Sequence, residues 1–255
     1  MKPVICSYYL TYRCNARCPF CAIHEDRSVP REHESSPDVV CRNLDDARRL
    51  GVKFVDFTGG EPLLYEGLPR VLACAKNIGL RTTLTTNGIL FPGRAREIAG
   101  LVDILQFSLH GPDRESHDAV TGTPSFDRVM ESVEDARANG GRPTFIHTVT
   151  NASIGRTVDV IALARKIRVP LFLNPCFEYF GNEGLLKEHI GKLERLAGGR
   201  GVSADLGYLR FLADGGNHTD NPRCLAVSSN VVISPDDRLV LPCWHHRLSG
   251  IPIGG

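Results

Sequence analysis

The sequence predicts an α/β fold built on a parallel sheet, and three observations lead to this prediction. Short apolar, β-rich segments alternate with longer helix-like segments as far as about residue 173. Polar motifs follow several of the predicted strands, at the end where parallel sheets carry their active sites. Hydrophobic residues make up 42% of the 255 residues and charged residues 23%, which is typical of a folded globular protein.

Six segments have the composition of strands, and five others have helical patterning. The strands are predicted at residues 4–10, 54–57, 82–85, 104–109, 144–149 and 171–173. The helices are predicted at residues 37–50, 67–78, 93–99, 125–139 and 157–167, several of them ending near glycine. Because helices separate successive strands, the pattern indicates βα units and parallel strands.

The alternation stops after about residue 198. Glycine-rich stretches follow, and then a segment at residues 227–241 that is typical of a β-hairpin turning at residues 235–237. We therefore expect two parts, a core at residues 1–198 and a small C-terminal appendage with a β-hairpin at residues 199–255. The sequence stops abruptly for a domain, so we expect the natural chain to extend beyond Gly255.

Charge and hydropathy give no signal for a nucleic acid or membrane partner. The formal net charge is +1, with both signs interspersed, so no broad electrostatic attraction is expected. No apolar run approaches the roughly 20 residues of a membrane span, and the first residues lack the apolar core of a signal peptide. We expect a cytoplasmic protein, in which nine cysteines favour metal binding or redox chemistry over disulfides.

Three cysteines lie within eight residues, directly after the first predicted strand. Cys14, Cys18 and Cys21 form a C-x3-C-x2-C motif, and three thiolates on one loop can bind a cubic iron–sulfur cluster while leaving one iron open. A zinc site completed by His24 is an alternative at this point. A thiol redox protein is another, because Cys18 and Cys21 form a C-x-x-C pair, although that reading does not use Cys14.

The motif C-x3-C-x-aromatic-C, with Phe20 as the aromatic residue, resembles the signature of the radical S-adenosylmethionine (SAM) superfamily. The resemblance implies a [4Fe-4S] cluster on Cys14, Cys18 and Cys21, with SAM on the open iron. It implies reductive cleavage of SAM to a 5'-deoxyadenosyl radical that modifies an organic or peptide substrate. It also implies a partial (βα)6 barrel and an external one-electron donor such as flavodoxin or ferredoxin.

Three later motifs resemble other SAM-contacting elements of the superfamily, and they occur in the same order. Residues 58–62 resemble its GGEP element, whose backbone and glutamate contact the methionine amine, and residues 84–88 and 107–112 resemble its third and fourth strand ends. His110 and the pair of His117 and Asp118 could face the substrate or merely precede and begin a helix. The resemblance implies SAM contacts at Phe20, Gly59, Gly60, Glu61, Thr86, Asn87 and Ser108.

Cys224 and Cys243 flank the predicted hairpin in an arrangement that resembles the start of the SPASM and twitch domains, which bind auxiliary iron–sulfur clusters. The resemblance implies that these two cysteines are ligands of an auxiliary cluster. Two ligands do not close a cluster, and no later C-x2-C pair follows, so Cys176, His245, His246 or residues downstream would have to contribute. Alternatively, the two cysteines are small buried side chains.

The substrate is the least determined part of the prediction. Only 13 residues precede Cys14, and no leader-binding domain is visible there, so we expect a small-molecule substrate in a biosynthetic pathway. A SPASM-type peptide-modifying enzyme is the alternative within the superfamily. A zinc- or cluster-stabilised binding module without catalysis is the alternative outside it.

Overall fold

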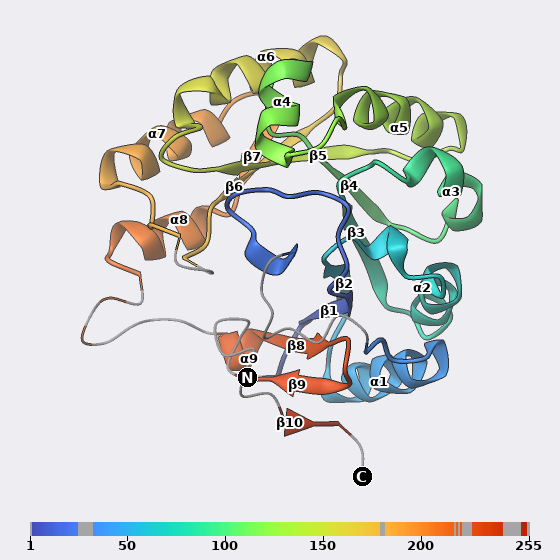
Figure 1. Cartoon of the computed structure of the whole chain (residues 1–255). Helices are drawn as coiled ribbons and strands as arrows, with labels where there is room; N and C mark the ends of the chain where they lie inside the picture. Colours follow the sequence, from blue (N-terminus) through green and yellow to red (C-terminus); the bar gives the residue numbers. More distant parts are fainter. Residues whose placement is uncertain are drawn as a thin grey trace.

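The computed structural model describes residues 2–24, 33–178, 182–216, 218, 220, 226–241 and 251–253. Its strands form one sheet in the order β10-β9-β8-β1-β2-β3-β4-β5-β6-β7. Helices surround the outer face of this curved sheet, and the loop after β1 lies inside the ring (Figure 1). The predicted α/β fold with a partial parallel barrel is therefore confirmed.

The six predicted strands are all present, and they pair with one another in sequence order. Neighbours from β1 to β7 are all parallel, as βα units require, and β8 is also parallel to β1. Their bounds are β1 Ile5–Thr11, β2 Phe54–Gly59, β3 Arg81–Thr86, β4 Ile104–Ser108, β5 Thr144–Val149, β6 Leu171–Pro175, β7 Val202–Ala204, β8 Asn230–Ser234, β9 Arg238–Val240 and β10 Ile251–Pro252.

The helices begin and end where local sequence signals place them. In α1, Ser36 caps the first turn, Pro37 occupies the first position, and Gly51 ends the helix with φ of 117°. The helices are α1 Pro37–Leu50, α2 Leu68–Asn77, α3 Phe91–Ile98, α4 Arg114–Thr121, α5 Phe126–Ala138, α6 Thr157–Lys166, α7 Lys187–Ala197, α8 Leu206–Ala213 and α9 Ala226–Ser229. None of the helices in the described ranges is long and apolar enough to cross a membrane.

The predicted hairpin forms from β8 and β9, but it is not separate from the barrel sheet. β8 pairs with β1, with Ile5 opposite Asn230 and Tyr8 opposite Ile233. The sheet also continues beyond residue 198 at its other edge, where β7 pairs with β6. Pairing between strands that are far apart in the chain cannot be predicted from local sequence. The division into parts at residues 1–198 and 199–255 stays a prediction.

The two faces of the sheet differ in polarity. Tyr8, Phe57, Phe107 and Phe145 point to the outer face and are fully buried under the helices. The residues that alternate with them face the interior of the barrel and are only partly buried. The interior is rich in polar side chains, namely Ser7, Asp56, Thr58, Thr83, Thr85, Gln106, Ser108, Thr148 and Asn174.

The hairpin also packs against the cysteine loop. Val232 of β8 and Val240 of β9 form a small buried cluster with Tyr12 and Ile23, which flank the three cysteines, and Cys21 packs on it. The C-terminal hairpin thus supports the loop that follows β1.

Candidate functional site

The cysteine loop begins at the carboxyl end of β1 and is fastened to the end of β2. The Gly60 N–H donates to the Thr11 carbonyl at 2.7 Å, and the Glu61 N–H donates to the Arg13 carbonyl at 2.8 Å. A Cβ atom at Gly59 would lie 2.3 Å from the Thr11 oxygen, and one at Gly60 would lie 2.2 Å from the Arg13 oxygen. The paired glycines are therefore needed for close backbone contact with the loop itself.

The three thiols of the loop are free and partly buried. Burial raises the pKa of Cys14 to about 11 and that of Cys18 to about 12, and the charges of neighbouring cysteines add to the effect. Burial also raises the pKa of Cys21. A bound metal cation would lower the pKa of these thiols instead of raising it, since a coordinated thiol loses its proton.

The chemistry of this loop fits an iron–sulfur cluster. The Ala16 N–H approaches the Cys14 sulfur at 3.4 Å, and N–H···S contacts are among the features that tune such clusters. No three His, Cys, Asp or Glu side chains in the described ranges converge on one ion, whereas the thiolates of a cubic cluster each bind a separate iron. Cys14, Cys18 and Cys21 are the residues that would hold the cluster.

Glu61 does not point into open space. Its side chain is buried, with 1% of the residue exposed. Its carboxylate accepts hydrogen bonds from the Thr86 hydroxyl at 2.7 Å, the Leu63 N–H at 2.9 Å and the Asn87 N–H at 2.8 Å. Burial raises the pKa of Glu61 to about 7, against the opposing effect of these donors. The observed role of Glu61 is to join the ends of β2 and β3, and its contact with the SAM amine stays a prediction.

The motif at residues 84–88, after β3, is hydrogen-bonded to the cysteine loop as well. The Asn87 side-chain amide donates to the Asn15 side-chain oxygen at 2.7 Å, between Cys14 and Cys18. Gly88 adopts φ of 77°, which the turn after β3 requires. Ser108, at the end of β4, lies on the interior face of the sheet and is partly buried. The structure thus brings the motifs at residues 58–62, 84–88 and 107–112 to the carboxyl edge of the sheet. Their SAM contacts stay predictions.

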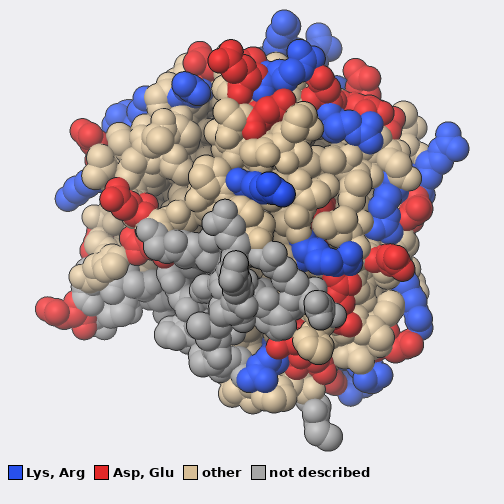
Figure 2. Space-filling model, in the orientation of Figure 1, with Lys and Arg blue, Asp and Glu red and all other residues tan. Residues whose placement is uncertain are grey.

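A cavity of about 440 Å³ opens beside the loop, at the carboxyl ends of β4 and β5. Its volume is in the range of cofactor and substrate sites. Figure 2 shows that neutral side chains dominate the centre of the viewed face, with a few separate basic groups. The lining residues are Pro19, Phe20, His110, Val120, Thr148, Thr150, Ala152, Ser153, Arg156 and Asn182.

His110 of this cavity belongs to a buried group of three histidines, a feature that the sequence did not resolve. Its ring packs edge-on against Phe20, with centroids 5.1 Å apart, and stacks on His117 at 6.1 Å. His147, on β5, lies at the same distance from His110. Burial lowers the pKa of all three, most strongly that of His110, so the group is neutral at physiological pH.

The hydrogen bonds of the three histidines assign their tautomers. The Thr148 N–H donates to His110 Nδ1 at 3.4 Å, so the proton of neutral His110 is on Nε2. The His110 N–H donates to His117 Nδ1 at 3.1 Å, and His147 Nδ1 donates to the Leu109 carbonyl at 2.9 Å. His117 is therefore structural, capping the β4 end, whereas His110 offers an N–H donor in the cavity wall.

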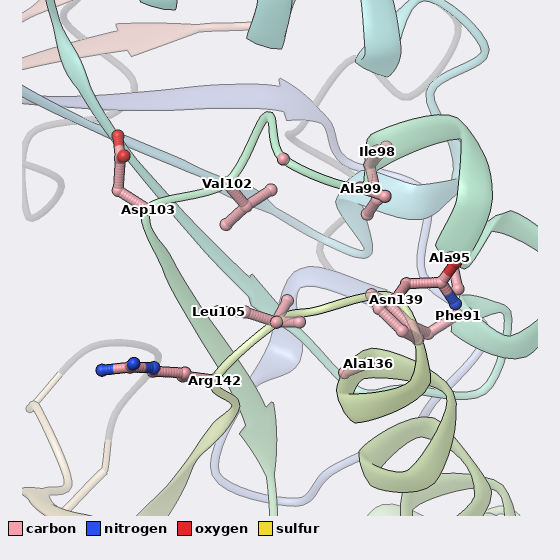
Figure 3. A pocket seen from close by; sticks show the side chains of 12 residues that line it. Phe91, Ala95, Ile98, Ala99, Val102, Asp103, Leu105, Ala136, Asn139 and Arg142 are labelled. Atoms are coloured by element: carbon pink, nitrogen blue, oxygen red, sulfur yellow. The ribbon is translucent and has the colours of Figure 1, made fainter.

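A second hollow, of about 40 Å³, lies on the outer side of the sheet (Figure 3). Phe91 and Ala95 of α3 and Ala136 of α5 line it, together with Asp103 at the amino end of β4. It is too small for a metabolite and lies at the opposite end of the strands from the cysteine loop. We assign it no function.

Of the predicted auxiliary ligands, the structure describes only Cys176. Cys224, Cys243, His245 and His246 lie outside the described residues. Cys176 follows β6 and is buried; burial raises its pKa to about 11, and the charge of Cys21 adds to the effect. Cys176 is thus close to the main cysteine loop. An auxiliary cluster on Cys224 and Cys243 stays a prediction.

Sequence comparison finds relatives of the core. The chain is 37% identical over 161 residues to "GTP 3',8-cyclase" of Mycobacterium marinum, a match that covers 61% of this chain and 44% of the relative. It is 33% identical over 173 residues to "Probable GTP 3',8-cyclase" of Halobacterium salinarum, covering 64% and 48%. The matched region therefore spans less than half of each relative.

Comparison with solved structures shows the same fold at low sequence identity. Streptococcus suis SuiB bound to precursor peptide SuiA superposes with a TM-score of 0.77 and 17% identity, covering 97% of this chain and 61% of SuiB. The structure named native anSMEcpe with bound AdoMet gives a TM-score of 0.72 and 18% identity, covering 97% and 76%.

The family model described as "Radical SAM superfamily" matches residues 8–173, from β1 to β6. This region contains the three cysteines and all the converging motifs. The chain belongs to the radical SAM superfamily of enzymes, which use a [4Fe-4S] cluster and S-adenosylmethionine.

Proposed function

We propose that this chain binds SAM across the carboxyl edge of its sheet, cleaves it reductively, and modifies a small organic substrate inside the barrel. The observation that carries the proposal is the linkage of three motifs. The cysteine loop is hydrogen-bonded through its backbone to Gly60 and Glu61, and through Asn15 to Asn87. A single rigid edge therefore holds the thiols beside the 440 Å³ cavity.

When bound to Cys14, Cys18 and Cys21, the [4Fe-4S] cluster would supply the electron that cleaves SAM to a 5'-deoxyadenosyl radical. The protein's part is orientation and exclusion of solvent. Phe20 and His110 form one wall of the cavity, and the neutral His110 ring offers a donor without adding charge. A flavodoxin or ferredoxin as the external electron donor belongs to the same proposal.

The relatives supply the first compound to test as substrate. They are named for a reaction of GTP, but the match covers the SAM-binding core and less than half of their length. The likeness to the peptide-bound SuiB structure is one of fold alone at 17% identity. We therefore propose a small molecule of a biosynthetic pathway, with GTP as the first candidate and a peptide as the alternative.

The test is reductive SAM cleavage by the anaerobically reconstituted chain, with dithionite as the electron source. We expect about four irons per chain for one cluster, and 5'-deoxyadenosine as a product. Separate Cys14→Ala, Cys18→Ala and Cys21→Ala variants should lose the iron and form no 5'-deoxyadenosine above background.

The matched control is Cys41→Ala, which removes a partly buried thiol on α1. It should keep the iron and the product. A colourless protein that contains zinc, or full SAM cleavage after loss of any of the three cysteines, would contradict the proposal.

A further inference from the structure

Two thiols meet away from the cysteine loop, where α1 and α2 lie side by side on the outer face of the sheet (Figure 1). The helices are packed closely at their first residues, because a Cβ at Gly67 would lie 2.5 Å from Pro37 Cγ. Cys41 is on α1 and Cys74 is on α2. The Cys41 thiol forms a side-chain hydrogen bond with the Cys74 thiol. Two cysteines that meet across a pair of helices can be joined by a disulfide.

A neighbouring ion pair shows that the two helices are aligned at this contact. Arg70 of α2 is paired with Asp38 of α1. Cys41 follows Asp38 by three residues, and Cys74 follows Arg70 by four. Because residues three or four apart lie on the same face of a helix, the ion pair and the thiol pair occupy successive turns of one interface. The two thiols therefore lie on the facing sides of α1 and α2.

The same two thiols are accessible to a dissolved oxidant. Among the described cysteines, Cys6 and Cys176 are buried, whereas Cys41 and Cys74 are partly exposed. Burial raises the pKa of Cys41 to about 12, and its hydrogen bond with Cys74 and the charge of that residue add to the effect. The thiolate is the nucleophile in disulfide exchange. Cys41 is therefore a poor attacking group, and we assign the attack to Cys74.

We propose that Cys41 and Cys74 form a reversible disulfide when the chain meets a low-molecular-weight disulfide such as oxidised glutathione. The Cys74 thiolate attacks one sulfur of the oxidant, which gives a mixed disulfide and releases one glutathione thiolate. Cys41 then loses its proton, attacks the Cys74 sulfur and releases the second glutathione. The two cysteines lose two electrons, which reduce the oxidant, and their two protons end on the two glutathione thiols. This modification is independent of the SAM chemistry.

The disulfide would join two βα units that hold the cysteine loop. α1 leads into β2 and α2 leads into β3. Gly60 and Asn87, which are hydrogen-bonded to the cysteine loop, directly follow these two strands. A bond that closes the segment 41–74 restricts the unfolded chain. We therefore expect the oxidised chain to melt roughly 4–15 °C above the reduced chain.

The first experiment maps the bond in the reconstituted chain after anaerobic incubation with excess oxidised glutathione. Remaining thiols are alkylated in denaturant, and trypsin then leaves Cys41 in peptide 32–42 and Cys74 in peptide 71–76. We expect these peptides to be recovered joined and to separate after reduction with dithiothreitol. The buried Cys6 should be recovered alkylated. If Cys41 and Cys74 are both recovered alkylated, or are joined equally well to other cysteines, the proposal is overturned.

The second experiment uses two single variants, and it follows glutathione adducts and melting temperature together. Cys41→Ser should accumulate glutathione on Cys74, because the thiol that resolves the mixed disulfide is gone. Cys74→Ser should carry at least about 5-fold less glutathione on Cys41. Neither variant should melt higher after oxidation. Equal adducts in the two variants would overturn the order of attack. An oxidised wild type that melts no higher than the reduced chain would show that the bond does not fit the folded chain.

Discussion

The outer and inner faces of the same strands follow opposite rules. On β2, Val55 and Phe57 are completely buried beneath helices, whereas Asp56 and Thr58 face the interior and are partly buried. The outer face resembles any hydrophobic core. The inner face keeps a carboxylate, that of Asp56, whose buried Oδ1 has no hydrogen-bond partner in the described ranges. The comparison teaches that one strand can bury an apolar core with one set of residues and leave polar side chains facing the barrel interior with the other.

The largest effect on stability should come from the outer face. Phe57→Ala removes a fully buried ring that contacts Tyr8 at a centroid distance of 6.5 Å. We expect the free energy of unfolding to fall by about 3–5 kcal/mol, measured by urea denaturation. Thr58→Val, one residue further and on the inner face, should change it by less than about 1 kcal/mol. Equal losses at the two positions would remove the distinction between the faces.

The next largest effect on stability should come from the contact between Gly60 and the cysteine loop. A Cβ at Gly60 would lie 2.2 Å from the Arg13 carbonyl oxygen, so Gly60→Ala should displace the loop and lower the unfolding free energy by roughly 1–3 kcal/mol. Iron content after reconstitution should fall with it.

Gly93→Ala is the control for Gly60→Ala, because nothing lies within 4 Å of its added Cβ. Gly93 is within α3, so alanine should stabilise the chain by about 0.5–1 kcal/mol. If Gly60→Ala retains full iron content and stability, the close contact between the glycines and the loop is not essential.

The smallest expected effect is a pH dependence of the unfolding free energy, caused by Asp56 on the inner face. The folded chain holds the Asp56 proton up to about pH 7, whereas the unfolded chain releases it near 3.8. The stability contribution of this proton is present at low pH and is lost as pH rises through 7. Asp56→Asn should therefore stabilise the chain by about 2 kcal/mol more at pH 8 than at pH 5, allowing for partial solvation. A gap that stays constant or shrinks with pH would show that Asp56 is already solvated or paired.

The strands were predictable because their outer faces carry mainly apolar and β-branched residues at every second position. α4 was not predicted, and its sequence explains why. Its buried residues are His117 and Thr121 rather than apolar side chains, so it has no apolar stripe. The buried His117 has hydrogen-bond partners in Ser125 and the His110 backbone, and these lie in the segments on either side of α4, outside the helix itself.

The residues of the site were predictable from the sequence, but the contacts between its motifs were not. The spacing of Cys14, Cys18 and Cys21, and the order of the motifs at successive strand ends, are enough to identify the superfamily from the sequence. The glycine pair was expected to face a ligand, yet its observed contact is with the cysteine loop. Spacing along the chain indicates which residues can take part in a site. It does not indicate which backbone segment packs against them in the folded chain.

The sequence by itself determined the α/β class, the cysteine loop and the edge at which the motifs gather, because each depends on short-range pattern and on the geometry of parallel strands. The tertiary structure alone decided that β8 joins β1, that Glu61 is enclosed by donors, and that Asp56 Oδ1 has no donor in the described ranges. Those three outcomes depend on which atoms from distant segments meet, and strand register fixes that only when the whole sheet has formed.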